Sequence, residues 1–258
     1  MQRNTQPAVM SSVLVLVLVS LACATVQPTP TNTLQPTVTI TAAPTATQTP
    51  RPSPTPRPTR TPNLAETQHV EELNAEVQAY YDKGYLATPD GKVTELDDFS
   101  YDWAQLGWYN WLPLRVSASD FFLSAHFKWN SAFQNSDTSG CGFIFGIQPN
   151  DDHYAVFLDR MKVYFLITDH TRGYSKPVTP TRGIGRVKFD YPAEADFTLI
   201  VKDAYAYILV NGEVVGEYTL AQSRPLNGDI GLSVLSGTNK DYGTRCEMTN
   251  LHLWIPNE

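Results

Sequence analysis

The chain has 258 residues, of which 42% are hydrophobic and 17% charged, and its formal net charge at pH 7 is −7. Residues 1–62 contain four arginines and no acid, which leaves 15 basic and 26 acidic side chains, a net charge of −11, for residues 63–258. Such an acidic surface repels phosphate backbones, so we expect no nucleic-acid partner.

Residues 1–23 are predicted to be a signal peptide with a lipobox-like end. Arg3 lies in a short n-region, and an apolar run, VLVLVLVSL, occupies residues 13–21. This run is too short to span a bilayer comfortably, because a spanning helix needs about 20 residues. The segment is therefore more typical of a cleaved signal than of a permanent helix.

The residues after the apolar run leave the type of cleavage open. Ser20-Leu21-Ala22-Cys23 resembles the lipobox of bacterial lipoproteins, whose Cys is acylated and becomes the new N-terminus. The position three before the Cys is usually Leu or Val, however, and Ala22-Cys23-Ala24 also fits an ordinary signal-peptidase site. We expect an exported protein that is anchored in the membrane through lipidated Cys23, with simple secretion or an uncleaved anchor as alternatives.

Residues 24–62 are predicted to be a disordered stalk rich in Pro and Thr. The stretch 27–62 contains 10 Pro and 12 Thr. Proline fixes φ and removes a backbone donor, so this segment is expected to be extended and polyproline-like. At roughly 3.1 Å per residue it reaches on the order of 100 Å. Its composition permits O-glycosylation, and an unmodified tether is the alternative.

Residues 63–84 are predicted to form a helix. Asn63 is a suitable N-cap, Glu66 completes a capping box, and Gly84 is a suitable C-terminal stop. The apolar positions recur at steps of three and four: Val70, Leu73, Val77 and Tyr80. This stripe could dock on the following domain, stiffen the stalk or pair with a second copy. We favour docking or spacing, because fewer than three heptads are present.

Residues 85–258 are predicted to be an all-β domain, a two-sheet antiparallel β-sandwich of the jelly-roll type. Short runs rich in aromatic and β-branched residues are separated by turn residues. These runs are 121–129, 142–148, 153–158, 162–168, 195–202, 205–210, 213–218, 228–235 and 246–255. Asn211-Gly212 predicts a type I′ hairpin, since that turn needs φ > 0 at both positions. About ten strands at this spacing favour a sandwich.

Two cysteines remain within the β-domain. If Cys23 is the lipid anchor, Cys141 and Cys246 form a pair that is expected to be oxidised in an exported protein. Two buried free thiols are the alternative. Neither a CxxC pair nor a His-rich tract accompanies them, so we expect no zinc site.

Several of these segments resemble one known superfamily. They are LDDFS (96–100), FFLSAHFKW (121–129), GCGFIFG (140–146), YAVFL (154–158), FTLIVK (197–202), YILVNGEVV (207–215), GDIGLSV (228–234) and NLHLWI (250–255). Together they are similar to the concanavalin A-like lectin/glucanase superfamily, in particular to the 3-keto-disaccharide hydrolase-like and LamG-like jelly rolls of exported proteins. The resemblance covers roughly residues 93–256. It implies that the strands near 121–129 and 246–255 are sheet neighbours. The superfamily has sugar-binding, sugar-cleaving and structural members, so the resemblance does not choose among these functions.

The sequence does not supply a convincing catalytic set. Family 16 glucanases on this fold carry a strand motif E-x-D-x-x-E, whose carboxylates share one face of the strand. Glu95 and Asp97 begin such a motif, but Ser100 stands where the last Glu belongs. We therefore assign no catalytic residue and lean against an enzyme.

No cofactor is indicated, although calcium is possible. Asp151, Asp152 and Asp241 are loop carboxylates that could join backbone carbonyls around Ca²⁺, and solvated loop acids are the alternative. The five histidines are scattered. His126 and His252 lie inside strand patterns, where we expect them on an exposed face.

Aromatic residues are the most suggestive feature for ligand binding. The run WAQLGWYNW (103–111) concentrates three Trp and one Tyr, and exposed rings of this kind stack on sugars. We expect Trp108 and Trp111 to be packed in the core or at an edge, and Tyr109 to be the most exposed. The candidate ligand-binding residues are Tyr109, Trp111, Asn239, Asp241 and Tyr242.

Three functional hypotheses follow. The first is a non-catalytic, cell-surface-anchored domain that binds extracellular carbohydrate. The second is a structural or adhesion protein of the envelope with protein contacts only, which an exposed apolar patch without a groove would favour. The third is a sugar-acting hydrolase, which needs converging carboxylates.

Overall fold

A computed structural model describes residues 64–136 and 138–257 of the chain. These residues fall in one compact unit that spans residues 59–258. The predicted signal peptide, Cys23 and the Pro/Thr stalk lie outside the described residues and stay predictions. Within the described part, no helix is both long enough and apolar enough to cross a membrane.

The helix predicted before the β-domain is α1 (Leu64–Asp82). Its C-terminus has the hydrogen bonds of a Schellman motif: the Tyr85 amide donates to the Tyr80 carbonyl (2.9 Å), and the Gly84 amide donates to the Tyr81 carbonyl (2.8 Å). Gly84 has φ +78°, which a residue without a Cβ adopts freely. The predicted stop at Gly84 is therefore confirmed.

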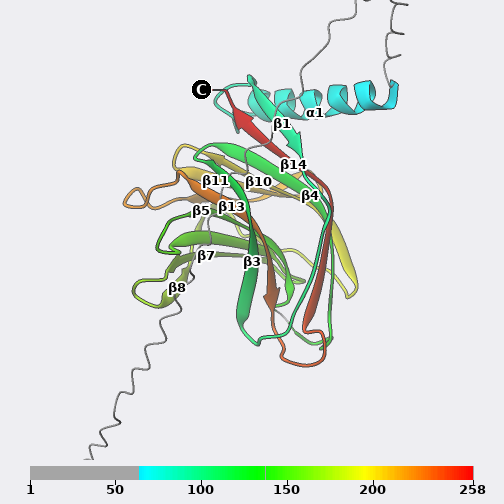
Figure 1. Cartoon of the computed structure of the whole chain (residues 1–258), viewed down its shortest axis with the longest axis vertical. Coiled ribbons are helices and arrows are strands. Elements are labelled where there is room, and N and C mark those ends of the chain that lie inside the picture. Colours follow the sequence, from blue (N-terminus) through cyan, green and yellow to red (C-terminus); the bar gives the residue numbers. More distant parts are fainter. Residues whose placement is uncertain (1–63, 137, 258) are drawn as a thin grey trace, which may run out of the picture. The chain divides into compact units, whose positions relative to one another are not determined.

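The strands form two antiparallel sheets, which confirms the predicted β-sandwich (Figure 1). The eight-stranded sheet runs, in spatial order, β1 (Gly91–Glu95), β14 (Thr244–Pro256), β4 (Phe121–Ser131), β10 (Ala193–Lys202), β11 (Tyr205–Val210), β12 (Glu213–Thr219) and β9 (Pro180–Gly183), with β2 (Phe99–Trp103) also pairing with β14. The six-stranded sheet runs β3 (Trp108–Ala118), β13 (Gly228–Ser236), β5 (Gly140–Ile147), β6 (His153–Leu158), β7 (Val163–Asp169) and β8 (Tyr174–Pro177).

Two predictions about the sheets are confirmed. The strand predicted near 121–129 is β4, and it pairs with the last strand, β14, as the resemblance implied. Asn211 and Gly212, with φ of 51° and 77°, make the tight turn between β11 and β12. The non-local pairing and the local turn therefore agree with the sequence pattern.

An aromatic core fills the space between the sheets. Phe127 of β4 lies against Phe143 of β5 and Phe197 of β10, with ring centroids 5.1 and 4.9 Å away. Cys141 and Cys246 are fully buried beside this core and form a disulfide that joins β5 to β14. The predicted disulfide is confirmed, and it connects the two sheets directly.

The helix α1 packs on the outer face of the eight-stranded sheet (Figure 1). Val77 and Tyr80 bury Phe122 of β4 and Trp254 of β14, and the Tyr80 and Phe122 rings meet edge to face at 5.4 Å. Docking is thus the arrangement that the structure shows. Val70, which we placed in the buried stripe, is exposed, because the contact begins one turn later at Leu73.

His252 does not lie on an exposed face as expected. Its Nε2 atom is 2.9 Å from Glu76 Oε2, so α1 covers this part of β14. His126 is half-exposed on the same outer face and contacts Asp196 at 2.8 Å. The difference between the two histidines comes from the helix, whose footprint the strand pattern does not contain.

Candidate functional site

A groove opens at one lateral side of the sandwich, where β2 and β3 are neighbouring edge strands of different sheets. In the described residues β2 pairs only with β14, and β3 pairs only with β13. We call the space between them the edge groove. It has a volume of about 410 Å³, and the residues that line it are Asp98, Phe99, Ser100, Tyr101, Asn110, Trp111 and Leu112.

Strand alternation explains how β2 builds its side of the edge groove. Phe99 and Tyr101 point to the same side of the strand, and their rings stack with centroids 6.2 Å apart. Phe99 is buried in the core, whereas Tyr101 lies further out and is 41% exposed. The aromatic wall therefore begins in the core and ends in solvent.

The facing wall comes from β3, where Asn110 and Leu112 line the edge groove and Trp108, on the same side of the strand, lies beside it. Trp108 is 63% exposed and Leu112 is 57% exposed. The amide of Asn110 donates to the Tyr101 hydroxyl across the edge groove, at 3.0 Å. The two walls are thus held together by one polar contact and flanked by exposed apolar side chains.

The edge groove offers the groups that a small polyhydroxylated ligand needs. Exposed aromatic rings can stack on the apolar face of a sugar ring. No protein partner among residues 64–136 and 138–257 occupies the Asp98 carboxylate or the Ser100 hydroxyl, so both can bond to a ligand. An apolar lining with a few polar groups is typical of small-molecule sites.

The exposure of the aromatic run differs from our expectation. Tyr109 is half-buried and Trp108 is exposed, so the expectations for these two residues were wrong, whereas Trp111 is packed as expected. Tyr109 and Trp111 point to the outer face of the six-stranded sheet, where they cover Phe157 and Leu235. The alternation along β3 is regular, but the sequence does not say which of its two faces meets solvent.

A hydrogen-bond chain fixes Tyr109 on that outer face. His153 Nδ1 lies 2.6 Å from the Asp151 carbonyl oxygen, which can only accept, so Nδ1 is the donor and Nε2 an acceptor in the neutral ring. The Tyr109 hydroxyl therefore donates to His153 Nε2 (2.7 Å) and accepts from the Thr168 hydroxyl (2.8 Å). Thr168 in turn accepts from the Ser175 hydroxyl (2.9 Å).

Burial shifts the pKa values of two members of this hydrogen-bond chain. Burial lowers the pKa of His153, against the opposing effects of the Asp151 carbonyl and carboxylate. Burial likewise raises the pKa of Tyr109, against the opposing hydrogen bonds of Thr168 and Ser175. Both groups are neutral at pH 7, so Tyr109 acts as a structural donor in a closed chain.

The other three candidate ligand residues lie apart from the edge groove, in the loop after β13. Asn239 and Asp241 are exposed. The Tyr242 ring lies under the Arg245 guanidinium at 4.8 Å, and Arg245 forms a bidentate pair with Asp102 of β2, at 2.9 and 2.8 Å. Of the five candidates, only Trp111 therefore lines the edge groove.

The candidate calcium ligands are not brought together. Asp151 and Asp152 follow β5 at the end where Asp229 pairs with Ile147, whereas Asp241 follows β13 at the opposite end. Within the described residues, no group of three His, Cys, Asp or Glu side chains could hold a metal ion. Asp152 instead lies 3.7 Å from Arg224.

The two carboxylates that begin the glucanase-like motif, Glu95 and Asp97, lie outside the edge groove. Glu95 lies at the end of β1 and pairs with His69 of α1 at 2.9 Å. Asp97 lies in the connection between β1 and β2. These carboxylates therefore belong to the helix contact and to a connection between strands.

Sequence reasoning missed Tyr101 and Asn110. Tyr101 could have been found from the alternation with Phe99, which places both rings on one side of a short strand. Asn110 acquires its role only from the approach of two strands that belong to different sheets, and no local pattern contains that information.

No protein-family model and no curated protein matches this sequence. Among solved structures, the chain is similar to carbohydrate binding module CBM66 from Bacillus subtilis, at 12% identity and a TM-score of 0.44, over 62% of this chain and 92% of that one. It is also similar to a fructosyltransferase from A. japonicus (17%, TM-score 0.42, 65% of this chain and 27% of that one). A third is the β-glucanase of Bacillus licheniformis (13%, TM-score 0.39, 55% and 69%).

These likenesses are weak. All three TM-scores lie below 0.5, and the chain spans only about a quarter of the fructosyltransferase. They therefore carry no conclusion about a ligand or a reaction. The sheet order of the protein itself is that of a two-sheet antiparallel β-sandwich.

Proposed function

We propose that the β-sandwich is a non-catalytic binding domain for extracellular carbohydrate and that the edge groove is its binding site. The observation that carries this proposal is the pairing of exposed rings with free polar groups. Tyr101 presents aromatic surface in the edge groove and Trp108 presents it beside the groove, while Ser100 and Asp98 offer hydrogen-bonding groups without a protein partner among the described residues. Sugars require both contacts, because each ring has an apolar face and a rim of hydroxyls.

The lining of the edge groove supports binding over hydrolysis. Glycoside hydrolysis needs two carboxyl groups about 5 to 9.5 Å apart. Asp98 is the one carboxylate that lines the groove in the described part of the chain. A single carboxylate can orient a sugar by accepting from its hydroxyls, which is the role we assign to Asp98.

A role in protein contacts alone is less well supported. A broad exposed apolar patch without a groove would favour that alternative. Leu106, Trp108 and Leu112 are exposed, but they lie next to an opening that also contains polar groups. The mixture favours a small polar ligand.

We further propose that the domain is exported and held at the cell surface through Cys23 and the Pro/Thr stalk. The support is the signal-like N-terminus together with the buried disulfide, because such bonds persist in oxidising compartments. Fatty-acid labelling of the expressed chain tests this proposal. Label is expected on the wild type and lost in Cys23→Ser, and an unlabelled wild type would contradict it.

The carbohydrate proposal is tested with a glycan array and polysaccharide pull-down of the full chain. Tyr101→Ala and Trp108→Ala are each expected to weaken binding about fivefold, since loss of a stacking contact is worth roughly 1 kcal/mol. Tyr205→Ala is the matched control, because Tyr205 is also 41% exposed but lies on β11. No binding to any glycan, or an equal loss in the control, would overturn the proposal.

A further inference from the structure

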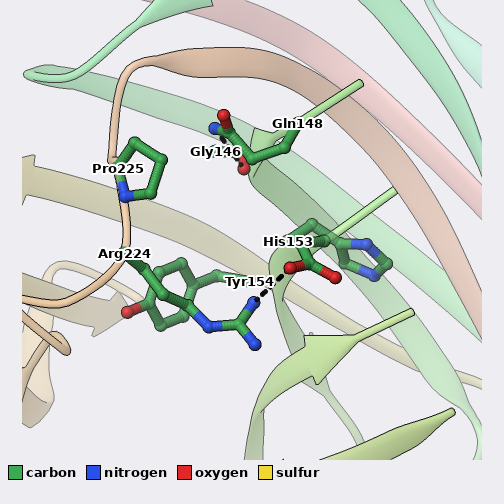
Figure 2. Close-up of a pocket in the computed structure, with 7 residues that line it drawn as sticks. Gly146, Gln148, His153, Tyr154, Arg224 and Pro225 are labelled. Atoms are coloured by element: carbon green, nitrogen blue, oxygen red, sulfur yellow. Dashed lines mark hydrogen bonds and ion pairs between the residues drawn. The ribbon is translucent and has the colours of Figure 1, made fainter. Parts of the chain in front are cut away.

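A second, more polar groove lies on the other lateral side of the sandwich, between β8 and the connection from β12 to β13. We call it the arginine groove. It has a volume of about 590 Å³, and its lining includes Asp152, Asp169, Arg172, Tyr174, Lys176 and Arg224. A smaller cavity of about 30 Å³ adjoins it and shares Asp152, Arg224 and Pro225. Figure 2 shows Arg224, Pro225, His153 and Gln148 around this smaller cavity.

Arg224 is fixed in place before any ligand arrives. Its side chain is 16% exposed and lies 3.1 Å from Asp169 and 3.7 Å from Asp152. It also donates to the Thr168 carbonyl at 2.7 Å, and Asp152 accepts from the His170 amide at 2.7 Å. Largely desolvated ion pairs add little to stability, because the penalty of removing charges from water offsets their attraction. The arrangement holds Arg224 in one position at the wall of the groove.

Two further cations remain available in the arginine groove. Arg172 is 73% exposed and reaches Asp169 only at 3.8 Å. Lys176 forms no ion pair with any carboxylate in the described part of the chain. The groove therefore has three cations and two carboxylates, in a domain region whose net charge is −11. This local excess of positive charge favours a negatively charged ligand.

We propose that the arginine groove binds a uronate unit of an acidic glycan, as a site separate from the edge groove. The cations can donate to the carboxylate of the sugar, and Asp152 and Asp169 can accept from its hydroxyls. A phosphate ion has no array of sugar hydroxyls to offer these two acids. The Tyr174 ring, which is partly exposed, completes the site with a surface on which a sugar can stack.

The test is calorimetric titration of the full chain with trigalacturonate, beside the neutral trimer of galactose, a sulfated galactose trimer and inorganic phosphate. Trigalacturonate is expected to bind, and its affinity should fall as salt is raised from about 50 to 300 mM, since partly exposed charges are screened. The neutral trimer and phosphate are expected to bind at least about tenfold more weakly. Equal binding of the neutral trimer, or tighter binding of the sulfated one, would overturn the uronate assignment, as would no binding of trigalacturonate.

Variants locate the site. Arg172→Gln and Lys176→Gln are each expected to weaken trigalacturonate binding about fivefold, because each removes one charged donor. Lys128→Gln, at an exposed position of β4, is the matched control and should have no effect. Tyr101→Ala and Trp108→Ala should also leave this binding unchanged, so the two grooves succeed or fail independently. Unchanged binding in both Arg172→Gln and Lys176→Gln would place the ligand elsewhere and contradict the inference.

Discussion

The two sheets of the sandwich both carry apolar side chains on their outer faces, but they cover them differently. On the eight-stranded sheet, Phe122 and Trp254 are buried by α1, which comes from outside the β-domain. On the six-stranded sheet, Phe157 and Leu235 are buried by the rings of Tyr109 and its neighbours, which come from the sheet itself.

This difference teaches that α1 is part of the folded domain rather than a spacer. Small residues let the six-stranded sheet cover itself, as at Gly142, where an added Cβ would lie 2.4 Å from the Phe157 ring. The eight-stranded sheet has large side chains at Phe122 and Trp254, which only a second layer can cover. The outer face of the eight-stranded sheet therefore depends on the chain before residue 85 for its cover, and the outer face of the six-stranded sheet does not.

Removing α1 is expected to have the largest effect. A chain that starts at residue 85 loses Leu73, Val77 and Tyr80, each of which contributes about 1.5 to 3 kcal/mol by burial. The summed loss of about 4.5 to 9 kcal/mol rivals the total stability of an ordinary domain, about 5 to 15 kcal/mol. Urea unfolding should show a chain that is unfolded or that binds hydrophobic dyes in the absence of denaturant.

The matched control is a chain that starts at residue 59, where the compact unit begins. It should unfold at the same urea concentration as the full chain. If residues 85–258 unfold at that concentration too, the helix contributes nothing and the comparison between the faces is broken.

Removing the disulfide is expected to have the next largest effect and to act on both faces together. Cys141 and Cys246 are 105 residues apart and join the two sheets. The chain-entropy model predicts a loss of about 4 to 5 kcal/mol for a loop of this size. Hydrogen exchange of the double Cys→Ala variant should accelerate by a similar factor in β4 and in β6. Acceleration in one sheet alone would show that the sheets do not share one cooperative core.

The sequence predicted the elements of this fold better than its surfaces. The Asn211-Gly212 turn and the Gly84 stop are local signals, since positive φ favours particular residues at those positions. The exposure of Trp108 and the burial of Tyr109 depend instead on β3 being an edge strand beside β2, which joins segments of different sheets. Alternation separates the two faces of a strand but does not identify the solvent face.

The arginine groove likewise could not be predicted from local sequence patterns. Arg224 lies in a connection far along the chain from Asp152 and Asp169, and no spacing rule links them. Only the sheet order, which places β7 and β8 beside the connection from β12 to β13, brings these residues into one groove. By contrast, the disulfide was predictable, because only two cysteines remained within the β-domain.

Tyr109→Phe tests the self-covered face with a smaller change. It removes the donor to His153 Nε2 and leaves that buried acceptor without its partner, at a cost of about 1 to 2 kcal/mol. Tyr80→Phe is the matched variant on the helix-covered face, where Glu76 keeps its contact with His252. Urea unfolding should therefore show the larger loss for Tyr109→Phe. An equal or larger loss for Tyr80→Phe would mean that the two faces do not differ in this way.

Acidification is expected to produce the smallest effect and to reach the self-covered face first. Burial lowers the pKa of His153 in the folded state, so the unfolded chain takes up the proton more readily as pH falls below about 6.5. Stability that depends on neutral His153 is therefore lost as pH falls from about 6.5 toward the folded pKa. Asp151 and Asp152 oppose this effect, while Arg224 adds to it.

Glu76, on the helix-covered face, should respond at lower pH. Burial raises the pKa of Glu76, but the bonds from His252 and Tyr80 outweigh it, so the net pKa falls below 4.5. Its contribution is present above that value and lost as pH falls through the folded pKa. Urea unfolding between pH 7 and 5 should show a decline in the wild type that is shallower in His153→Gln, because this variant lacks the buried imidazole. Equal slopes in the two proteins would assign the acid sensitivity to a group other than His153.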